Sequence, residues 1–377
     1  MSSGRGARIL VVDDDAAMLR AVERVLEREH EVACFASPCR ALERAPALRP
    51  QVAVVDVQMA EMDGFELTRA LRLADPQLRV ILMTGSAFGT DEKLVRAIEE
   101  EAFYFIHKPF DRSVLRTLVA RCLELRRLED ENRGWLRHLE AQMAEARAFQ
   151  RTMLPAPSAV LEGIEIHTAY HPSTELAGDL CDYAVAGPGQ IALVVADVVG
   201  HGASAAMLTA LVKSAFHAAR ADTYEPMSIV RRVSESLAAF DSSRFVTLVT
   251  ARLDLAADRL DYVVAGHEGA LLAPVDAGPR RLKSTGPLIS SSPLLAALDW
   301  SAASAPFPPG ARLLFYTDGI TEAANGDDEL GRQPLLDRLA DGLHGDELVR
   351  SVLDAVDAHA PEADDDRTLL TARRPAD

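Results

Sequence analysis

The sequence lacks the features of exported and membrane-spanning proteins. No apolar run approaches the ~18 to 20 residues needed to cross a bilayer, and the start MSSGRGARILVVDDD has no apolar segment long enough for export. The four cysteines, Cys34, Cys39, Cys122 and Cys181, form no CxxC pair. We therefore expect a cytoplasmic protein with reduced thiols and no membrane partner.

Basic residues are also scarce. Fifty-seven acids against 40 bases leave a formal net charge of −17. Nucleic-acid binding needs a clustered basic surface, so we do not expect a nucleic-acid partner. Acidic substrates would need a metal ion to offset this negative field. The length of 377 residues predicts roughly two to three domains.

Residues 7 to 118 alternate short apolar runs with amphipathic stretches. RILVV precedes a helix-like AAMLRAVERVLERE, and EVACF, QVAVVD, VILMTG and FYFIHKPF follow at intervals. This alternation predicts a parallel sheet that is covered by helices on both faces. Ligands of such sheets bind at the carboxyl ends of the strands.

A long helical stretch follows, from about Leu118 to Met153, without proline or turn dipeptides. Steps of alternately three and four residues visit a mostly apolar series: Leu118, Arg121, Leu125, Leu128, Asn132, Trp135, Leu139, Gln142, Ala146, Phe149 and Met153. This spacing is typical of a coiled coil, in which a buried Asn fixes the register. We expect a parallel homodimer through this helix. One helix packed on a neighbouring domain is the alternative, and Gly134, which costs roughly 1 kcal/mol, is a candidate break.

Pro155 and Pro157 predict the end of that helix. Beyond them the strand-like runs are IEIHTAY, IALVVAD, RFVTLVTARLD, LDYVVAG, ALLAPV, RLLFYTD and TLLTARR. Helical blocks around residues 203–220 and 226–240 interrupt these runs, which favours an α+β layered sandwich. The predicted domains are therefore 1–120, 121–154 and 155–377.

Three acids follow two strands of the first region. Asp13 and Asp14 come after RILVV, and Asp56 comes after QVAVV. Carboxylates so close together repel unless a hard cation such as Mg²⁺ lies among them. Two further strand ends add Thr84, a hydroxyl donor, and Lys108, a charge suited to a phosphoryl oxygen. Together these residues indicate a phosphoryl site.

The motifs VVDDD, DVQMAEMDG, MTGS and HKPF resemble those of a two-component response-regulator receiver domain. The resemblance implies a doubly wound, flavodoxin-like α/β fold with a five-stranded parallel sheet. It implies that Asp56 accepts a phosphoryl group from a sensor histidine kinase. The implied Mg²⁺ ligands are Asp13, Asp14, Asp56 and the carbonyl of Gln58.

By the same resemblance, Thr84 and Lys108 bind the phosphoryl oxygens and Phe105 takes the place of the aromatic switch residue. The bond between Lys108 and Pro109 would be cis. The sequence departs from the receiver pattern at Ala60, where the family usually has proline, and this departure removes no ligand.

A second set of acids lies in the last region. Asp179 lies in ELAGDLCDY, Asp197 in VVADVVGHG and Asp318 in LLFYTDGIT, while Asp365 and Asp366 lie in ADDDRTLL. Each Asp alone fits a turn or a helix cap. Several carboxylates without a His or Cys set favour Mg²⁺ or Mn²⁺ over zinc. Two such ions about 3.5 to 4 Å apart activate water and clamp a phosphate.

Other chemistries have less support. No GxSxG motif is present, and neither Cys181 nor His201 has an identifiable catalytic partner. His201 is interpreted as a turn residue that supports the site, and the role of His267 stays open. The glycines after Asp197 do not have the spacing of a GHKL-type histidine kinase, and AGDLCD offers only part of a diguanylate cyclase motif.

The motifs FQRTMLP, AGDLCDY, ADVVGHGASAAML, VVAGH, FYTDGITEA and DDRTLL resemble the SpoIIE/RsbU-like branch of the metal-dependent type 2C (PPM) protein serine/threonine phosphatases. The resemblance implies a β-sandwich flanked by helices and two Mn²⁺ or Mg²⁺ ions. Asp197 would bridge both ions. Asp179 and the Val198 carbonyl would complete one ion's site, and Asp318 and Asp365 the other, with Asp366 as the rival of Asp365. Departures at Ala177 and Glu268 remove no ligand.

The two resemblances together imply a response regulator. Phosphorylation of Asp56 would control a phosphatase that acts on phosphoserine or phosphothreonine of a partner, a STAS-type anti-sigma-factor antagonist. The alternative is a catalytically inactive, receiver-gated module that binds and sequesters the antagonist.

Overall fold

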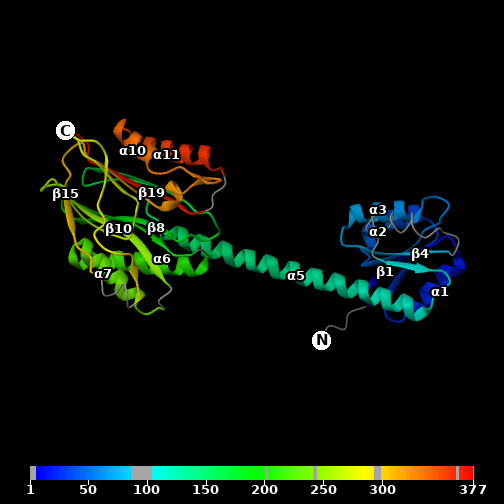
Figure 1. Cartoon of the computed structure of the whole chain (residues 1–377). Helices are drawn as coiled ribbons and strands as arrows, with labels where there is room; N and C mark the ends of the chain where they lie inside the picture. The colour runs from blue at the N-terminus through cyan, green and yellow to red at the C-terminus, as the bar shows by residue number, and fades with distance from the viewer. Residues whose placement is uncertain are drawn as a thin grey trace. The chain divides into compact units, whose positions relative to one another are not determined.

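A computed structural model describes residues 6–85, 104–200, 202–240, 244–292, 299–361 and 365–376. Contacts divide the chain into two compact units, Met1–Leu139 and Glu140–Asp377 (Figure 1). In the described residues, no helix is both long and apolar enough to traverse a bilayer.

The first unit contains a five-stranded parallel sheet in the order β2-β1-β3-β4-β5. Its strands are β1 (Arg8–Val12), β2 (Glu31–Phe35), β3 (Val52–Asp56), β4 (Arg79–Thr84) and β5 (Tyr104–His107). The three central strands are buried along almost their whole length, which explains their continuous apolar runs. The predicted doubly wound α/β fold is confirmed.

Helices cover both faces of this sheet. They are α1 (Ala16–Leu26), α2 (Pro38–Leu48), α3 (Gly64–Ala74) and the first turns of α5 (Arg112–Thr152). α1 and α5 bury Leu26 and Val119 against one face, and α2 and α3 bury Ala41 and Phe65 against the other. Side-chain caps start the helices: Asp15 accepts from the Ala17 amide, and Asp63 forms a capping box with Glu66.

The predicted long helix is confirmed as α5, 41 residues long, which begins at Arg112 and continues through Gly134 without a break. Ion pairs one helical turn apart lie before the glycine: Arg121 with Glu124, and Arg127 with Glu131. Such pairs contribute about 0.2 to 0.5 kcal/mol each, which offsets part of the cost of the glycine. The pairing of α5 in a coiled coil stays a prediction.

The second unit is a sandwich of two mainly antiparallel sheets. One has the order β15-β11-β10-β9-β8, with β14 paired to β10, and the other has the order β13-β12-β16-β19-β7-β6. The strands of the first sheet are β8 (Asp179–Gly187), β9 (Gln190–Val198), β10 (Phe245–Asp254), β11 (Arg259–Ala265), β14 (Ile289–Ser290) and β15 (Ala303–Pro306). The strands of the second are β6 (Ser158–Leu161), β7 (Ile164–His171), β12 (Ala270–Ala273), β13 (Arg280–Arg281), β16 (Arg312–Tyr316) and β19 (Arg367–Arg373). A short hairpin adds β17 (Ala324–Asn325) and β18 (Asp328–Glu329).

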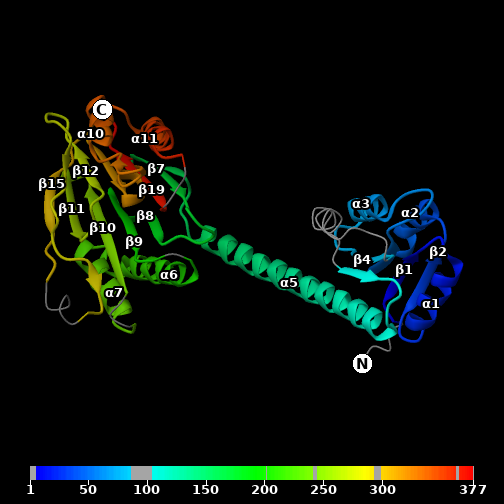
Figure 2. The same cartoon turned by 45° about the vertical axis from the view of Figure 1, so that its right-hand side comes forward.

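Among the described residues, a pair of helices packs on each outer face of the sandwich. α6 (Ala203–Ala218) and α7 (Pro226–Leu237) pack on the first sheet, while α10 (Gln333–Ala340) and α11 (Gly345–His359) pack on the second. Figure 2 shows α6 and α7 on one side and α10 and α11 on the other. The short helices are η1 (Ala219–Asp222) and α9 (Asp318–Thr321). The predicted flanked β-sandwich is confirmed. Sequence reasoning found α6 and α7 but missed α10, α11 and strand β8.

Candidate functional site

The acids of the first unit meet at the carboxyl ends of two adjacent strands. β1 and β3 pair in parallel, with Val12 opposite Val55, so that Asp13 and Asp56 leave neighbouring strand ends. One carboxylate oxygen from each of Asp13, Asp14 and Asp56 lies within 4.8 Å of the others. Such a set of oxygen ligands suits a hard cation.

Lys108 contacts two of these acids. Its Nζ lies 2.6 Å from Asp13 Oδ2 and 2.7 Å from Asp56 Oδ1. Burial lowers the pKa of Lys108, but its hydrogen bonds to Asp13 and Asp56 outweigh burial and raise it overall. Burial raises the pKa of the Asp13 carboxyl despite the contact with Lys108. The lysine therefore stays charged and holds the two carboxylates together.

The other predicted receiver residues surround this centre. Thr84 ends β4 and is buried, and its carbonyl accepts from the Lys108 amide at 2.7 Å. Phe105 lies on β5, half-buried against the core. Gln58 is exposed, two residues after Asp56. The bond between Lys108 and Pro109 is cis, as expected.

In the sandwich, β8 and β9 bring two acids together. The strands are antiparallel neighbours, and Asp179 lies directly opposite Asp197 in their register. Asp179 is buried and Asp197 is half-buried. Since both residues belong to one ladder, their Cα atoms cannot separate without disrupting it.

The second sheet contributes the remaining acids. Asp318 follows β16, and Asp365 lies just before β19, the strand that pairs with β16. Thr317 joins this sheet to the first: its hydroxyl donates to Asp179 Oδ2 at 2.7 Å and accepts from the Thr368 amide at 3.0 Å. The acids therefore lie at one rim of the sandwich.

Asp365 and Asp366 differ in their contacts. The Asp366 carboxylate accepts from the Ser173 amide and hydroxyl, at 2.8 and 3.0 Å, and from the Gly178 amide at 2.7 Å. It is buried, whereas Asp365 is exposed and accepts from the Asp366 amide at 2.7 Å. Asp366 thus holds the loop that precedes Asp179, and Asp365 keeps more of its carboxylate accessible.

Two glycines allow the backbone to approach closely. A Cβ at Gly178 would lie 2.6 Å from the Val198 carbonyl oxygen, and one at Gly319 would lie 2.1 Å from the Asp366 carbonyl oxygen. Both distances are far shorter than van der Waals contact, so larger residues would displace these carbonyls. Close packing therefore explains the glycines next to Asp179 and Asp318.

Burial and neighbouring acids raise the pKa values of Asp179 and Asp197. Burial raises the pKa of Asp179 well above its usual value, and the charge of Asp197 adds to this. Burial, followed by the charges of Asp318 and Asp365, raises the pKa of Asp197 to about 7. Asp197 therefore interacts with acids from both sheets, which places it at the centre of the group.

This donor set fits divalent cations. It consists of carboxylates from both sheets, and their mutual repulsion is the condition that a hard cation relieves. Within the described ranges, only Asp13, Asp14 and Asp56 have carboxylate oxygens that all lie within 4.8 Å of one another. The acids of the sandwich are therefore more widely spaced than those of the receiver.

His267 and Cys181 have structural roles. His267 is buried, with Nδ1 2.8 Å from the Thr247 hydroxyl of one sheet and Nε2 2.9 Å from the Tyr316 carbonyl of the other. Burial raises the pKa of Cys181 to about 12, so this thiol does not supply a thiolate. His201 lies outside the described residues.

Sequence reasoning missed several residues of the site. Glu322 lies one helical turn after Asp318, and its charge adds to the raised pKa of Asp197. Outside the rim, on the helix-covered face of β8, Asp182 contacts α6 through Lys213 Nζ at 2.6 Å and His217 Nε2 at 2.8 Å. The spacing of DGITE would have signalled Glu322, but nothing local marks Thr317 or Asp182.

The fold and these two groups of acids define a receiver domain joined to a sandwich of the PP2C type. The sequence matches the Response regulator receiver domain over residues 9–120 and Stage II sporulation protein E (SpoIIE) over residues 187–375. The second match covers half of the chain, and the chain belongs to the SpoIIE family.

Relatives of known name match parts of the chain. Phosphoserine phosphatase RsbP of Bacillus subtilis is 28% identical over 182 residues, which cover 47% of this chain and 44% of that protein. The chain thus spans less than half of that relative. The SiaA-PP2C domain of Pseudomonas aeruginosa has a TM-score of 0.54 at 20% identity, covering 63% of this chain and 98% of its own. The RsbU and RsbW domains of Rv1364c from Mycobacterium tuberculosis give 0.50 at 27% identity, covering 58% and 62%.

His267 makes the stability of the sandwich depend on pH. Burial lowers the pKa of His267 from 6.5 to about 4. Between these two pH values, His267 is therefore protonated in the unfolded chain but neutral in the folded chain. Stability is therefore full above pH 6.5 and falls as pH drops toward 4. Between pH 8 and 5.5 we expect a loss of roughly 1 kcal/mol that His267→Gln does not show.

Urea unfolding in a Trp135→Phe background tests this, since Trp300 packs against the core of this unit and is then the only tryptophan. His138→Gln, at an exposed position on α5, is the control and should retain the wild-type pH dependence. The same pH dependence in His267→Gln and wild type would refute the assignment.

Proposed function

We propose that this chain is a response regulator whose receiver controls a metal-dependent protein phosphatase. The observation that carries the proposal is the convergence of Asp179, Asp197, Asp318 and Asp365 at one rim of a PP2C-type sandwich. The substrate is phosphoserine or phosphothreonine on a partner protein. Its class, a STAS-type anti-sigma-factor antagonist, follows from the family resemblance, and the name of RsbP, a phosphoserine phosphatase, supports phosphoserine.

Two Mn²⁺ or Mg²⁺ ions complete the proposed site. Asp197, which lies between the acids of the two sheets, would contribute to both ions; Asp179 and the Val198 carbonyl would help to hold one, and Asp318 and Asp365 the other. The contacts of Asp366 with Ser173 and Gly178 support Asp365 over Asp366 as the ligand. Bound ions would activate water and stabilise charge on the phosphoryl oxygens. Thr317 and Asp366 keep the carboxylates in position.

In the receiver, a sensor histidine kinase supplies the phosphoryl group to Asp56. Asp13, Asp14, Asp56 and the Gln58 carbonyl would hold one Mg²⁺. Lys108 and Thr84 then bind the phosphoryl oxygens, which would draw Lys108 from its contact with Asp56. Phe105 is the residue that responds to this change. The alternative is an inactive module that only binds the phosphorylated antagonist.

The Asp197→Asn variant distinguishes a metal-dependent phosphatase from an inactive binding module. Removing one charge relieves repulsion, so without metal (in EDTA) we expect the variant to be at least as thermally stable as wild type. Mn²⁺ should raise the melting temperature of wild type more than that of the variant. Mn²⁺-dependent hydrolysis of p-nitrophenyl phosphate should fall at least 100-fold, as expected for loss of a central metal ligand.

Asp254→Asn is the matched control. Asp254 lies at the end of β10 that is far from the partner of Asp197, and it pairs with Gln190 at the other end of β9. It should keep both the metal response and the activity. An inactive wild type that still gains stability from Mn²⁺ would favour the binding module. Equal activity of wild type and Asp197→Asn would reject the metal assignment.

The end of α5 contacts the loop that leads to Asp179, which suggests how the receiver acts. The side chain of Gln150 is buried; its Nε2 donates to the Ala177 carbonyl at 2.8 Å, and its Oε1 accepts from the Ala177 amide at 3.2 Å. Arg147 forms an ion pair with Glu175 in the same loop. Movement of α5 would therefore shift the backbone next to Gly178 and Asp179.

Gln150→Ala should uncouple the receiver from hydrolysis. Beryllofluoride, which mimics an acyl phosphate on Asp56, should change the phosphatase rate of wild type but not of Asp56→Ala. In Gln150→Ala the ratio of rates with and without beryllofluoride should move to that of Asp56→Ala. Glu145→Ala, exposed on the same helix, should respond as wild type does, and a wild-type ratio in Gln150→Ala would refute the coupling.

The apolar positions of the heptad pattern support a homodimer through α5. Leu128, Trp135, Leu139 and Phe149 are 46%, 71%, 56% and 64% exposed, although large apolar side chains are usually buried. In a parallel pair, a second α5 would cover them, with Asn132 fixing the register.

Leu139→Glu should shift the chain from dimer to monomer, because it places like charges in the seam. Sedimentation velocity at micromolar concentration measures this directly. Arg137→Glu, on the opposite side of the heptad, makes a larger change in charge and should leave the dimer intact. A dimeric Leu139→Glu protein would refute this interface.

A further inference from the structure

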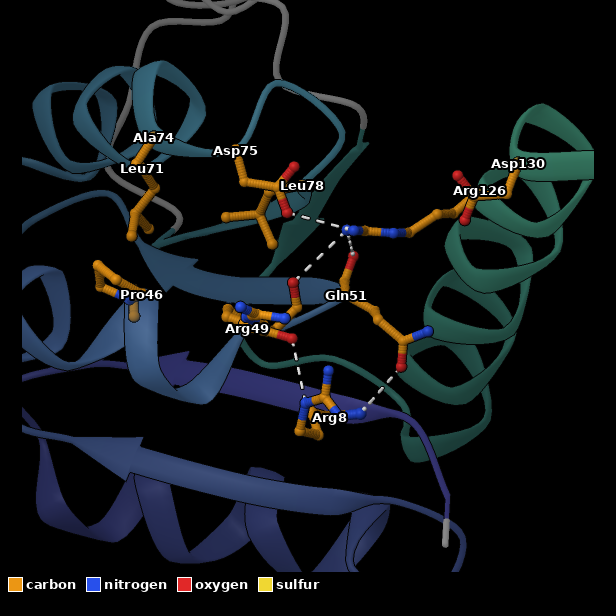
Figure 3. Close-up of a pocket in the computed structure, with 12 residues that line it drawn as sticks. Arg8, Pro46, Arg49, Gln51, Leu71, Ala74, Asp75, Leu78, Arg126 and Asp130 are labelled. Carbon is orange, nitrogen blue, oxygen red and sulfur yellow. Dashed lines mark hydrogen bonds and ion pairs between the residues drawn. The ribbon is translucent and has the colours of Figure 1, made fainter. Parts of the chain in front are cut away.

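The first unit contains a pocket that the phosphoryl chemistry does not use. Its volume is about 450 Å³, and it lies among the ends of α2 and α3, the start of β1 and the side of α5 (Figure 3). Small-molecule sites have volumes of about 300 to 1,000 Å³, whereas packed interiors hold few voids larger than a water molecule. The pocket therefore has the size of a ligand site.

The pocket lies at the edge of the sheet opposite the phosphoacceptor. Arg8 begins β1, Gln51 precedes β3 and Leu78 precedes β4, whereas Asp56 and Thr84 end their strands. A ligand here would not compete with a phosphoryl group on Asp56.

Arginine side chains form its polar wall, and one of them joins the wall to α5. Arg126 donates to the carbonyls of Gln51 and Gln77, both at 3.3 Å, and to Asp75 at 3.2 Å. The other acid of the wall, Asp130, lies 3.7 Å from Arg133. Both acids of the pocket thus already have a cationic partner.

Arg8 and Arg49 keep unmatched charge. Arg8 donates from Nε to the Arg49 carbonyl at 3.1 Å, and no acid among the described residues pairs with either guanidinium. In a chain in which acids outnumber bases 57 to 40, these two neighbouring arginines give the pocket a local positive charge. Guanidinium groups bind phosphate, phosphonate and carboxylate groups in a bidentate manner.

The backbone conformation of Arg49 is a second feature of this wall. Arg49 follows α2 in the left-handed conformation, with φ of 47°, a position at which glycine or asparagine is preferred. Ala45, Pro46, Leu71 and Leu78 form an apolar wall beside the guanidinium groups.

We propose that this pocket binds a small organic anion. Arg8 and Arg49 bind its phosphate, phosphonate or carboxylate group, and the wall of Pro46, Leu71 and Leu78 contacts its apolar part. The ligand also contacts Arg126 of α5, so its binding stabilises the packing of this part of α5 on the sheet of the first unit. The binding itself does not depend on the proposed phosphatase activity.

Isothermal titration calorimetry with phenylphosphonate tests the proposal on the full chain. The carbon–phosphorus bond resists hydrolysis, and EDTA removes the metal ions that would bind the probe elsewhere. We expect saturable binding at one site. Arg49→Gln should weaken it at least tenfold, as expected for the loss of one charge-assisted hydrogen-bonding partner, and Arg8→Gln should have a similar effect.

Arg44→Gln is the matched control, since Arg44 is exposed on α2 and does not line the pocket. It should bind as wild type does, and unchanged thermal unfolding of Arg49→Gln shows that its fold is intact. Neutral benzyl alcohol should bind at least tenfold more weakly than phenylphosphonate. Equal binding by wild type and Arg49→Gln, no binding to wild type at millimolar concentration, or equal affinity for inorganic phosphate would each overturn the proposal.

Discussion

Repulsion between carboxylates that the strands hold close together is the constraint on which both units depend. Two unit charges 4 Å apart repel by about 4 kcal/mol at the effective dielectric constant of a protein surface. Asp13 and Asp56 leave adjacent parallel strands, and Asp179 faces Asp197 across an antiparallel ladder. The backbone hydrogen bonds of the sheets and the burial of the apolar strand faces stabilise the fold against this repulsion.

The two units balance this charge in different ways. In the receiver, Lys108 lies between Asp13 and Asp56 and supplies an internal cation. In the described part of the sandwich, no lysine or arginine forms an ion pair with Asp179 or Asp197, and the pKa of Asp197 rises to about 7. The receiver thus has a lysine beside its acids, whereas Asp179 and Asp197 have no such partner in the described part of the sandwich.

Much of the fold and of both acidic groups could be predicted, because most of the acids lie at or just after the end of an apolar run, as Asp56, Asp197 and Asp318 do. β8 was missed because Asp179 and Asp182 interrupt the apolar pattern that marks a strand. The roles of Thr317 and Asp366 could not be read locally, since their partners Asp179 and Gly178 lie 138 and 188 residues away in the sequence. The acid triplet at 364–366 likewise gives no register until Asp366 is seen to contact Gly178.

The position of β19 sets the order in which the sandwich can assemble. This strand, Arg367–Arg373, lies between β16 and β7, and the acids just before it complete the rim and hold the loop before Asp179. A growing chain on the ribosome therefore contains β8, β9 and β16 long before their acids can be brought into place. All the acids of the rim can thus come together only after β19 has been synthesised and has paired with β16 and β7.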